Sequence, residues 1–186
     1  MTDNQRVAAA TRDWVEKVVI GYNFCPFAKP VFTPDLIRYE VDDSGNPADI
    51  LETVYQACQT LRESPEIATT LVIFYRCGND FDDYLDILGM AERLLDASGF
   101  SGEFQLASFH PDYLFEGEDP DDASHYTNRS PWPVLHIIRE KDIEEAMKNK
   151  DESSAIYERN MRKAASLGSQ HLAQLLASLR QGQGQG

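Results

Sequence analysis

The chain reads Thr69-Thr70-Leu71-Val72-Ile73-Phe74-Tyr75 between positions 69 and 75. This run is almost continuously apolar and rich in β-branched residues, which is typical of a strand buried on both faces. Apolar residues recur at helical spacing on either side of it, in residues 47–63 and 80–98. A strand between two such helices indicates an α/β domain.

The pattern extends outward from this unit. Three further strands are predicted at residues 36–41, 104–109 and 134–138, and three further helices at residues 3–20, 142–149 and 153–179. The two consecutive β-α-β crossovers predict three parallel strands with right-handed connections, and the fourth strand is predicted to lie antiparallel beside them.

The expected fold class is therefore α/β, with one three-layer domain over residues 1–180. Its sheet is expected to have four strands, mostly parallel, in the order β-α-β-α-β-β-α after an N-terminal helix. Residues 23–33 are interpreted as a packed loop. The final stretch, 181–186, has low complexity and no apolar side chain, so we expect it to be disordered.

Charge and cysteine content limit the function. The 186 residues include 17 Lys and Arg against 31 Asp and Glu, a net charge of -14, which disfavours binding to nucleic acid or to anionic membranes. The three cysteines form no CxxC pair, so reduced thiols are expected. With neither a signal-peptide pattern nor a long apolar run, the expected location is the cytoplasm.

Polar residues follow the predicted strands at their carboxyl ends, where open α/β sheets bind ligands. Arg76, Asn128 and Arg129 are expected there, beside helix N-termini that favour anions. The sequence therefore predicts a small anionic ligand at this edge. The alternative is that the arginines pair with the acidic loop at residues 116–122, which is interpreted as a solvated face rather than a Mg²⁺ or Ca²⁺ site.

Catalytic chemistry is an open hypothesis at this edge. His110 ends a strand with Asp112 two residues on, so the pair is a candidate for general acid–base work. Cys25 precedes a proline and is a reserve candidate for a nucleophile, with burial in an aromatic loop as the alternative. His136 is assigned to the ligand-binding set, although a histidine in the middle of a strand is often simply buried and hydrogen-bonded. The sequence leaves open which cofactor, if any, the protein uses and whether it is an enzyme.

Two other classes of function remain. His110, His125 and His136 would be the ligands of a transition metal, but their spacing matches no zinc signature. A protein-binding module would use Trp132, between two prolines, as an exposed anchor.

Three motifs carry a family resemblance. They are residues 23–30 (NFCPFAKP), residues 104–113 (FQLASFHPDY) and residues 128–140 (NRSPWPVLHIIRE). The chain resembles, over roughly residues 5 to 180, a bacterial and plastid family described as a domain of unknown function. The resemblance implies a soluble protein of one domain and no particular reaction. The matching motif positions are Cys25, His110, Pro111, Tyr113, Asn128, Arg129, Pro131, His136 and Arg139.

Overall fold

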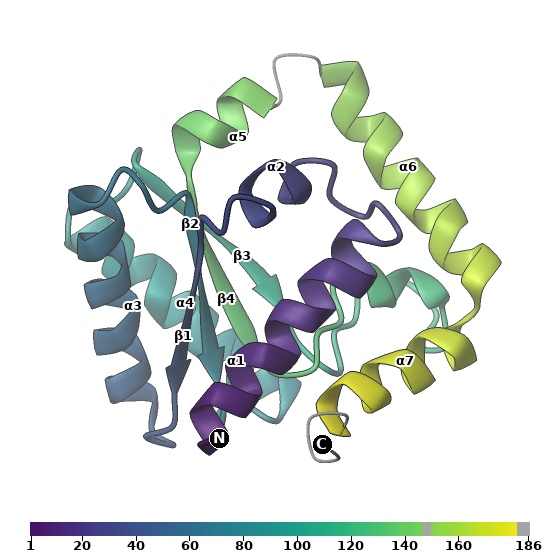
Figure 1. Cartoon of the computed structure of the whole chain (residues 1–186), viewed down its shortest axis with the longest axis horizontal. Coiled ribbons are helices and arrows are strands. Elements are labelled where there is room, and N and C mark those ends of the chain that lie inside the picture. The colour runs from purple at the N-terminus through teal and green to yellow at the C-terminus, as the bar shows by residue number, and fades with distance from the viewer. Residues whose placement is uncertain (147–149, 182–186) are drawn as a thin grey trace.

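A four-stranded sheet forms the centre of the protein. The computed structural model describes residues 1–146 and 150–181, and Figure 1 shows helices on both sides of its sheet. The strands are β1 (Ile37–Asp42), β2 (Thr69–Phe74), β3 (Phe104–Phe109) and β4 (Val134–Arg139). The helices are α1 (Asp3–Trp14), α2 (Ala28–Phe32), α3 (Pro47–Glu63), α4 (Phe81–Ala97), α5 (Glu140–Ala146), α6 (Lys150–Leu167) and α7 (Ser169–Gln181).

The sheet is mixed, which corrects the predicted mostly parallel arrangement. Its strand order is β1-β2-β4-β3, with β1 and β2 parallel and β4 antiparallel to both of its neighbours. The first three strands do share one direction, but β4 is inserted between β2 and β3. The physical reason lies in the side chains of β4: Leu135 and Ile137 face one side, while Val134 contributes to the apolar cluster on the other. A strand with apolar groups on both faces is stabilised in the interior of a sheet.

Helices cover the two faces of the sheet separately. One apolar cluster joins α3 and α4 to the sheet through fully buried residues that include Ile50, Val54, Val72, Phe74 and Ile87. Cys58 is also fully buried in this cluster. A second cluster joins α1, α6 and α7 to the opposite face and includes Trp14, Leu71, Ala164 and Leu172. None of the described helices is long and apolar enough to span a membrane.

The N-terminal helix widens before it ends. It begins with a capping box formed by Thr2 and Gln5, and it changes at Val15 into the π-helix η1 (Val15–Ile20). π-helices are rare and frequently lie at functional sites. The segment ends at Gly21, where a Cβ atom would meet the carbonyl group of Lys17, with the carbonyl carbon at 2.9 Å. Glycine therefore permits the close turn that brings residues 22–27 back over the sheet.

Two segments differ in the structure from what the sequence predicts. The predicted loop at residues 23–33 contains the short helix α2, which lies over the sheet in Figure 1. The predicted long helix at 153–179 is two helices, α6 and α7, because Gly168 adopts a φ of +80° that other residues disfavour. Gln181 belongs to α7, and the rest of the predicted tail, residues 182–186, lies outside the described residues.

Candidate functional site

His110 is fully buried at the carboxyl end of β3. Its Nε2 lies 2.9 Å from the carbonyl oxygen of Gly78, and its Nδ1 accepts the backbone N–H of Asp112 at 3.0 Å. A carbonyl only accepts and an N–H only donates, so the ring is neutral with its proton on Nε2. Burial also lowers the pKa of His110. The geometry uses both ring nitrogens to hold the chain, and the Asp112 contact is made by its backbone rather than its carboxylate.

His125 is held in the same manner. Its Nδ1 accepts the backbone N–H of Phe115 at 3.1 Å, and its Nε2 donates to the carbonyl oxygen of Asp119 at 2.8 Å. The two histidines thus organise the long loop between β3 and β4, which includes the 3-10 helix η2 (Ala123–Thr127). Within the described part of the chain no group of three or more His, Cys, Asp or Glu side chains is placed to hold a metal ion.

The three residues predicted to bind an anion point to separate partners. Arg129 donates through Nε to the carbonyl oxygen of Tyr113 at 3.1 Å and lies 4.5 Å above the ring of Tyr126. Asn128 donates to the carbonyl oxygen of Ser108 at 3.2 Å. Arg76 is exposed and lies beside the ring of its neighbour Tyr75. These three side chains therefore do not converge on a common anion site at the carboxyl edge of the sheet.

Trp132, the predicted anchor for a protein partner, is half-buried. Its ring packs at 5.4 Å against Tyr75 and under the guanidinium of Arg180 at 4.3 Å. These contacts cover much of the aromatic surface that a partner would otherwise use.

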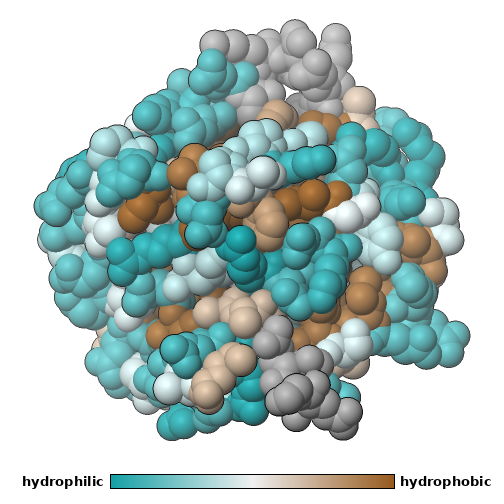
Figure 2. All heavy atoms as spheres, viewed as in Figure 1, coloured by the Kyte–Doolittle hydropathy of each residue, from teal (hydrophilic) through white to brown (hydrophobic). Residues whose placement is uncertain are grey.

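A large cavity lies on the sheet face that α1, α2 and α6 cover, toward the amino ends of β1 and β2. Its volume is about 450 Å³, within the range typical of small-molecule sites. Figure 2 shows apolar side chains reaching the surface beside α1 and α2. The lining is largely apolar, and its polar side chains are those of Cys25, Thr69, His136 and Asp142.

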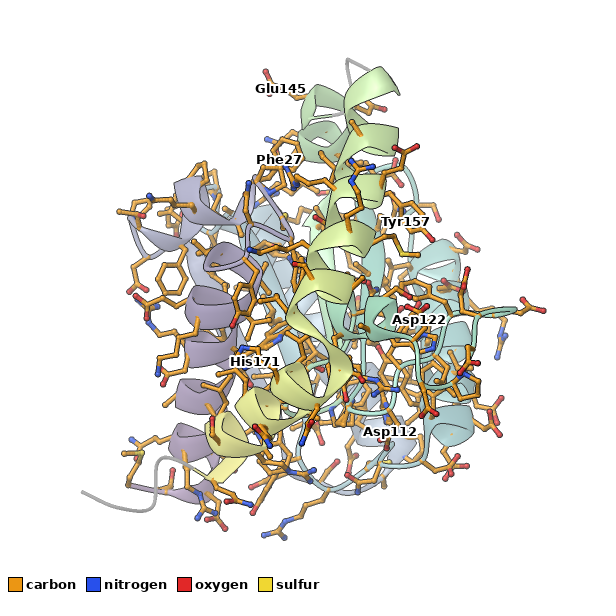
Figure 3. All side chains as sticks on the ribbon, turned by 90° about the vertical axis from the view of Figure 1, so that its right-hand side faces the viewer. Phe27, Asp112, Asp122, Glu145, Tyr157 and His171 are labelled. Carbon is orange, nitrogen blue, oxygen red and sulfur yellow. The ribbon has the colours of Figure 1, made fainter. Side chains whose placement is uncertain are left out.

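This cavity is remote from the predicted site at the carboxyl edge. In Figure 3, Phe27, which lines the cavity and is 45 % exposed, lies toward the α5 end of the molecule. Asp112 lies toward the opposite end in the same view. Of the residues predicted for the site, Cys25 and His136 line the cavity, whereas His110, Asp112 and both arginines do not.

His136 projects from the middle of β4 into this cavity, and its hydrogen bonds fix its tautomer. Thr69 donates its single hydroxyl proton to the carbonyl oxygen of Ile137 at 2.6 Å, so its oxygen must accept from His136 Nε2 at 2.7 Å. The proton is therefore on Nε2 and the lone pair on Nδ1. That Nδ1 atom has no hydrogen-bond partner among residues 1–146 and 150–181.

The surroundings of His136 keep it uncharged. Burial lowers its pKa from the usual 6.5 to about 4, because the charged form loses solvation without gaining a carboxylate partner. The surface that the ring still exposes borders the cavity. At neutral pH the cavity thus contains a neutral hydrogen-bond acceptor amid apolar side chains.

Cys25 also lines the cavity, and burial raises the pKa of its thiol. The backbone N–H groups of Phe27 and Ala28 and the charge of Arg159 oppose this shift without overcoming it. The thiol is therefore protonated at neutral pH, which makes it a weak nucleophile.

A second, smaller cavity of about 240 Å³ lies on the other side of Cys25. It shares Val19, Cys25 and Phe109 with the large cavity. Its other lining residues are the apolar Phe24, Phe115 and Met161 and the polar Thr127, Asn128, Tyr157 and Asn160. Asn160 donates to the carbonyl oxygen of Phe24 at 2.6 Å, so α6 holds the loop that carries Cys25.

Several lining residues were not predicted from the sequence. Thr69 was assigned only to a buried strand, and Val19 only to a regular helix. Asn160 and Asp142 lie in predicted helices with no nearby motif. The available signals were His136 within an otherwise apolar strand and the aromatic residues around Cys25, and both point to the cavity.

Comparison with curated proteins and with solved structures gives no significant match. A family model described as "Protein of unknown function (DUF1415)" matches residues 6–174. The matched range includes both cavities and all three sequence motifs. The chain therefore belongs to the DUF1415 family, as its resemblance to a domain of unknown function predicted.

Proposed function

We propose that the protein binds a small, predominantly apolar organic molecule in the large cavity, and that His136 Nδ1 accepts a hydrogen bond from its hydroxyl or N–H group. The observation that carries this proposal is a neutral imidazole with an unpartnered lone pair in an apolar cavity of about 450 Å³. The ring is half-buried and its exposed surface borders the cavity, so a ligand there can reach this lone pair. A ligand with one donor would form a hydrogen bond to it while burying its own apolar surface.

The charges around the cavity oppose an anion at this point. His136 is neutral and Asp142 is acidic, so neither attracts a negative group. The group that reaches His136 is therefore an uncharged donor, unlike the anion predicted for the carboxyl edge of the sheet. The proposal assigns His110 a role in positioning the β3–β4 loop and assigns no reaction to the protein.

The cavity proposal predicts binding of 4-hexylphenol, measured by isothermal titration calorimetry. Ala68 lines the cavity, so Ala68→Leu is expected to weaken binding about tenfold or more by filling it, since overpacking costs about 1–3 kcal/mol. The control is Ala97→Leu, an exposed position at the end of α4 on the opposite face. Absence of binding to the wild type, or equal loss in both variants, would contradict the proposal.

The same titration tests the hydrogen bond. The methyl ether 1-hexyl-4-methoxybenzene has no donor, so the wild type is expected to prefer the phenol by about three- to tenfold. His136→Leu should abolish this preference. If the ether binds as tightly as the phenol in the wild type, His136 is not the acceptor.

A further inference from the structure

The two cavities meet at one set of residues. Val19, Cys25 and Phe109 line both, so the two cavities are adjacent at these residues. Val19 belongs to η1, whose wide turn also lets its carbonyl oxygen accept the backbone N–H of Phe24 at 2.9 Å. The π-helix and the Cys25 loop thus form the partition between the cavities.

The two cavities differ in polarity. In the large cavity the charged lining residue is Asp142, in the first turn of α5. The polar lining of the second cavity includes Asn128 and Asn160. Each donates one amide N–H to a backbone carbonyl oxygen and has a second amide N–H to donate. Tyr157 adds a hydroxyl on a side chain that is 52 % exposed. Figure 3 shows Tyr157 on α6.

Arg159 brings positive charge to this end. Its Nη2 donates to the carbonyl oxygen of Asn23 at 2.7 Å and to Asn160 Oδ1 at 3.3 Å. Its remaining N–H groups have no hydrogen-bond partner in the described part of the chain. Arg159 does not itself line the second cavity, but its hydrogen bond to Asn160, which does, places the guanidinium next to it. Its positive charge also favours the charged form of the Cys25 thiol. The neighbouring basic side chains of α6 have other partners. Arg162 forms an ion pair with Glu158, and Lys163 lies over the ring of Tyr22.

We propose that the ligand is an amphipathic carboxylate whose apolar body fills the large cavity and whose anionic end lies in the second cavity, beside Arg159 and the amides of Asn128 and Asn160. This inference rests on the proposed function and extends it to the class of ligand. Guanidinium and amide N–H groups are donors that a carboxylate accepts from, and charge-assisted hydrogen bonds are the stronger ones. Asp142 at the other end repels the carboxylate and fixes the direction in which the ligand enters.

Isothermal titration calorimetry of the protein with 6-(4-hydroxyphenyl)hexanoate and, separately, with 4-hexylphenol tests this ligand class. The two probes share the phenol and the six-carbon chain and differ in the terminal carboxylate. The wild type is expected to bind the carboxylate about tenfold more tightly. Arg159→Gln, which keeps an amide donor, should remove this difference and leave the affinity for 4-hexylphenol unchanged, whereas Arg159→Lys should keep much of it.

The matched control is Arg162→Gln, which removes the same charge one turn along α6 from an exposed side chain. Equal affinities of the two probes in the wild type, or an equal effect of both glutamine variants, would overturn the inference while the cavity proposal stands. If neither probe binds to the wild type, the cavity proposal itself fails.

Discussion

The free energy of unfolding is expected to fall by about 3 kcal/mol between pH 6.5 and pH 4 through His136 alone. Burial lowers the pKa of this histidine from 6.5 in the unfolded chain to about 4 in the folded protein. Between these values the unfolded state binds a proton that the folded state does not, so stability is lost as the pH falls and the loss levels off below pH 4. The carboxylates of this acidic chain titrate in an overlapping range, so the contribution must be isolated by a variant.

Urea unfolding of the wild type and of His136→Leu over this pH range makes that separation. The variant lacks the titrating ring, and Thr69 keeps its bond to the carbonyl oxygen of Ile137, so its pH dependence should be shallower by about 3 kcal/mol. His171→Leu, at an exposed position of α7 that Figure 3 labels, is the control and should retain the wild-type slope. Parallel pH profiles for the wild type and His136→Leu would show that His136 is not held neutral.

Replacement of His110 by alanine is expected to destabilise the protein by about 4 kcal/mol. The change opens a cavity where the ring packs at 5.2 Å from Phe81 and 5.1 Å from Tyr84. It also leaves the carbonyl of Gly78 and the N–H of Asp112 without their partner. The midpoint of urea unfolding at neutral pH measures this loss.

This result separates two roles for His110. A histidine kept for acid–base chemistry would be dispensable for folding, as the sequence-based hypothesis requires. A histidine that holds the loop is required for folding stability. His171→Ala is the control, and we expect little change there because that side chain is exposed. Wild-type stability of His110→Ala would return the residue to the list of catalytic candidates.

The strands were predictable because each carries its own pattern, but their order depends on pairings that no local pattern specifies. The predicted strand 104–109 became β3 with its bounds unchanged. Its place at the sheet edge is consistent with the exposed side chain of Gln105. β4, with apolar groups on both faces, takes the interior position instead. The polar Gln105 in β3 and the nearly continuous apolar run of β4 were the available signal for the mixed sheet.

The cavity could not be predicted as a whole because its walls come from helices and strands far apart in the sequence. Val15 and Val19 line it from the π-helix η1, and helical periodicity does not reveal that the helix widens there. Cys25 and His136 were identified, but topology alone placed them in different surroundings. The geometry that unites them is a property of packing between α1, α2 and the sheet.

The most direct test of the central claim is a nitrogen-15 NMR measurement of the His136 ring, assigned by comparison with His136→Leu. We predict a neutral ring at pH 7 with the proton on Nε2 and a bare Nδ1, whose resonance moves when 4-hexylphenol is added and stays unchanged with 1-hexyl-4-methoxybenzene. A proton on Nδ1, a charged ring at pH 7, or an Nδ1 resonance that does not respond to the phenol would contradict the account.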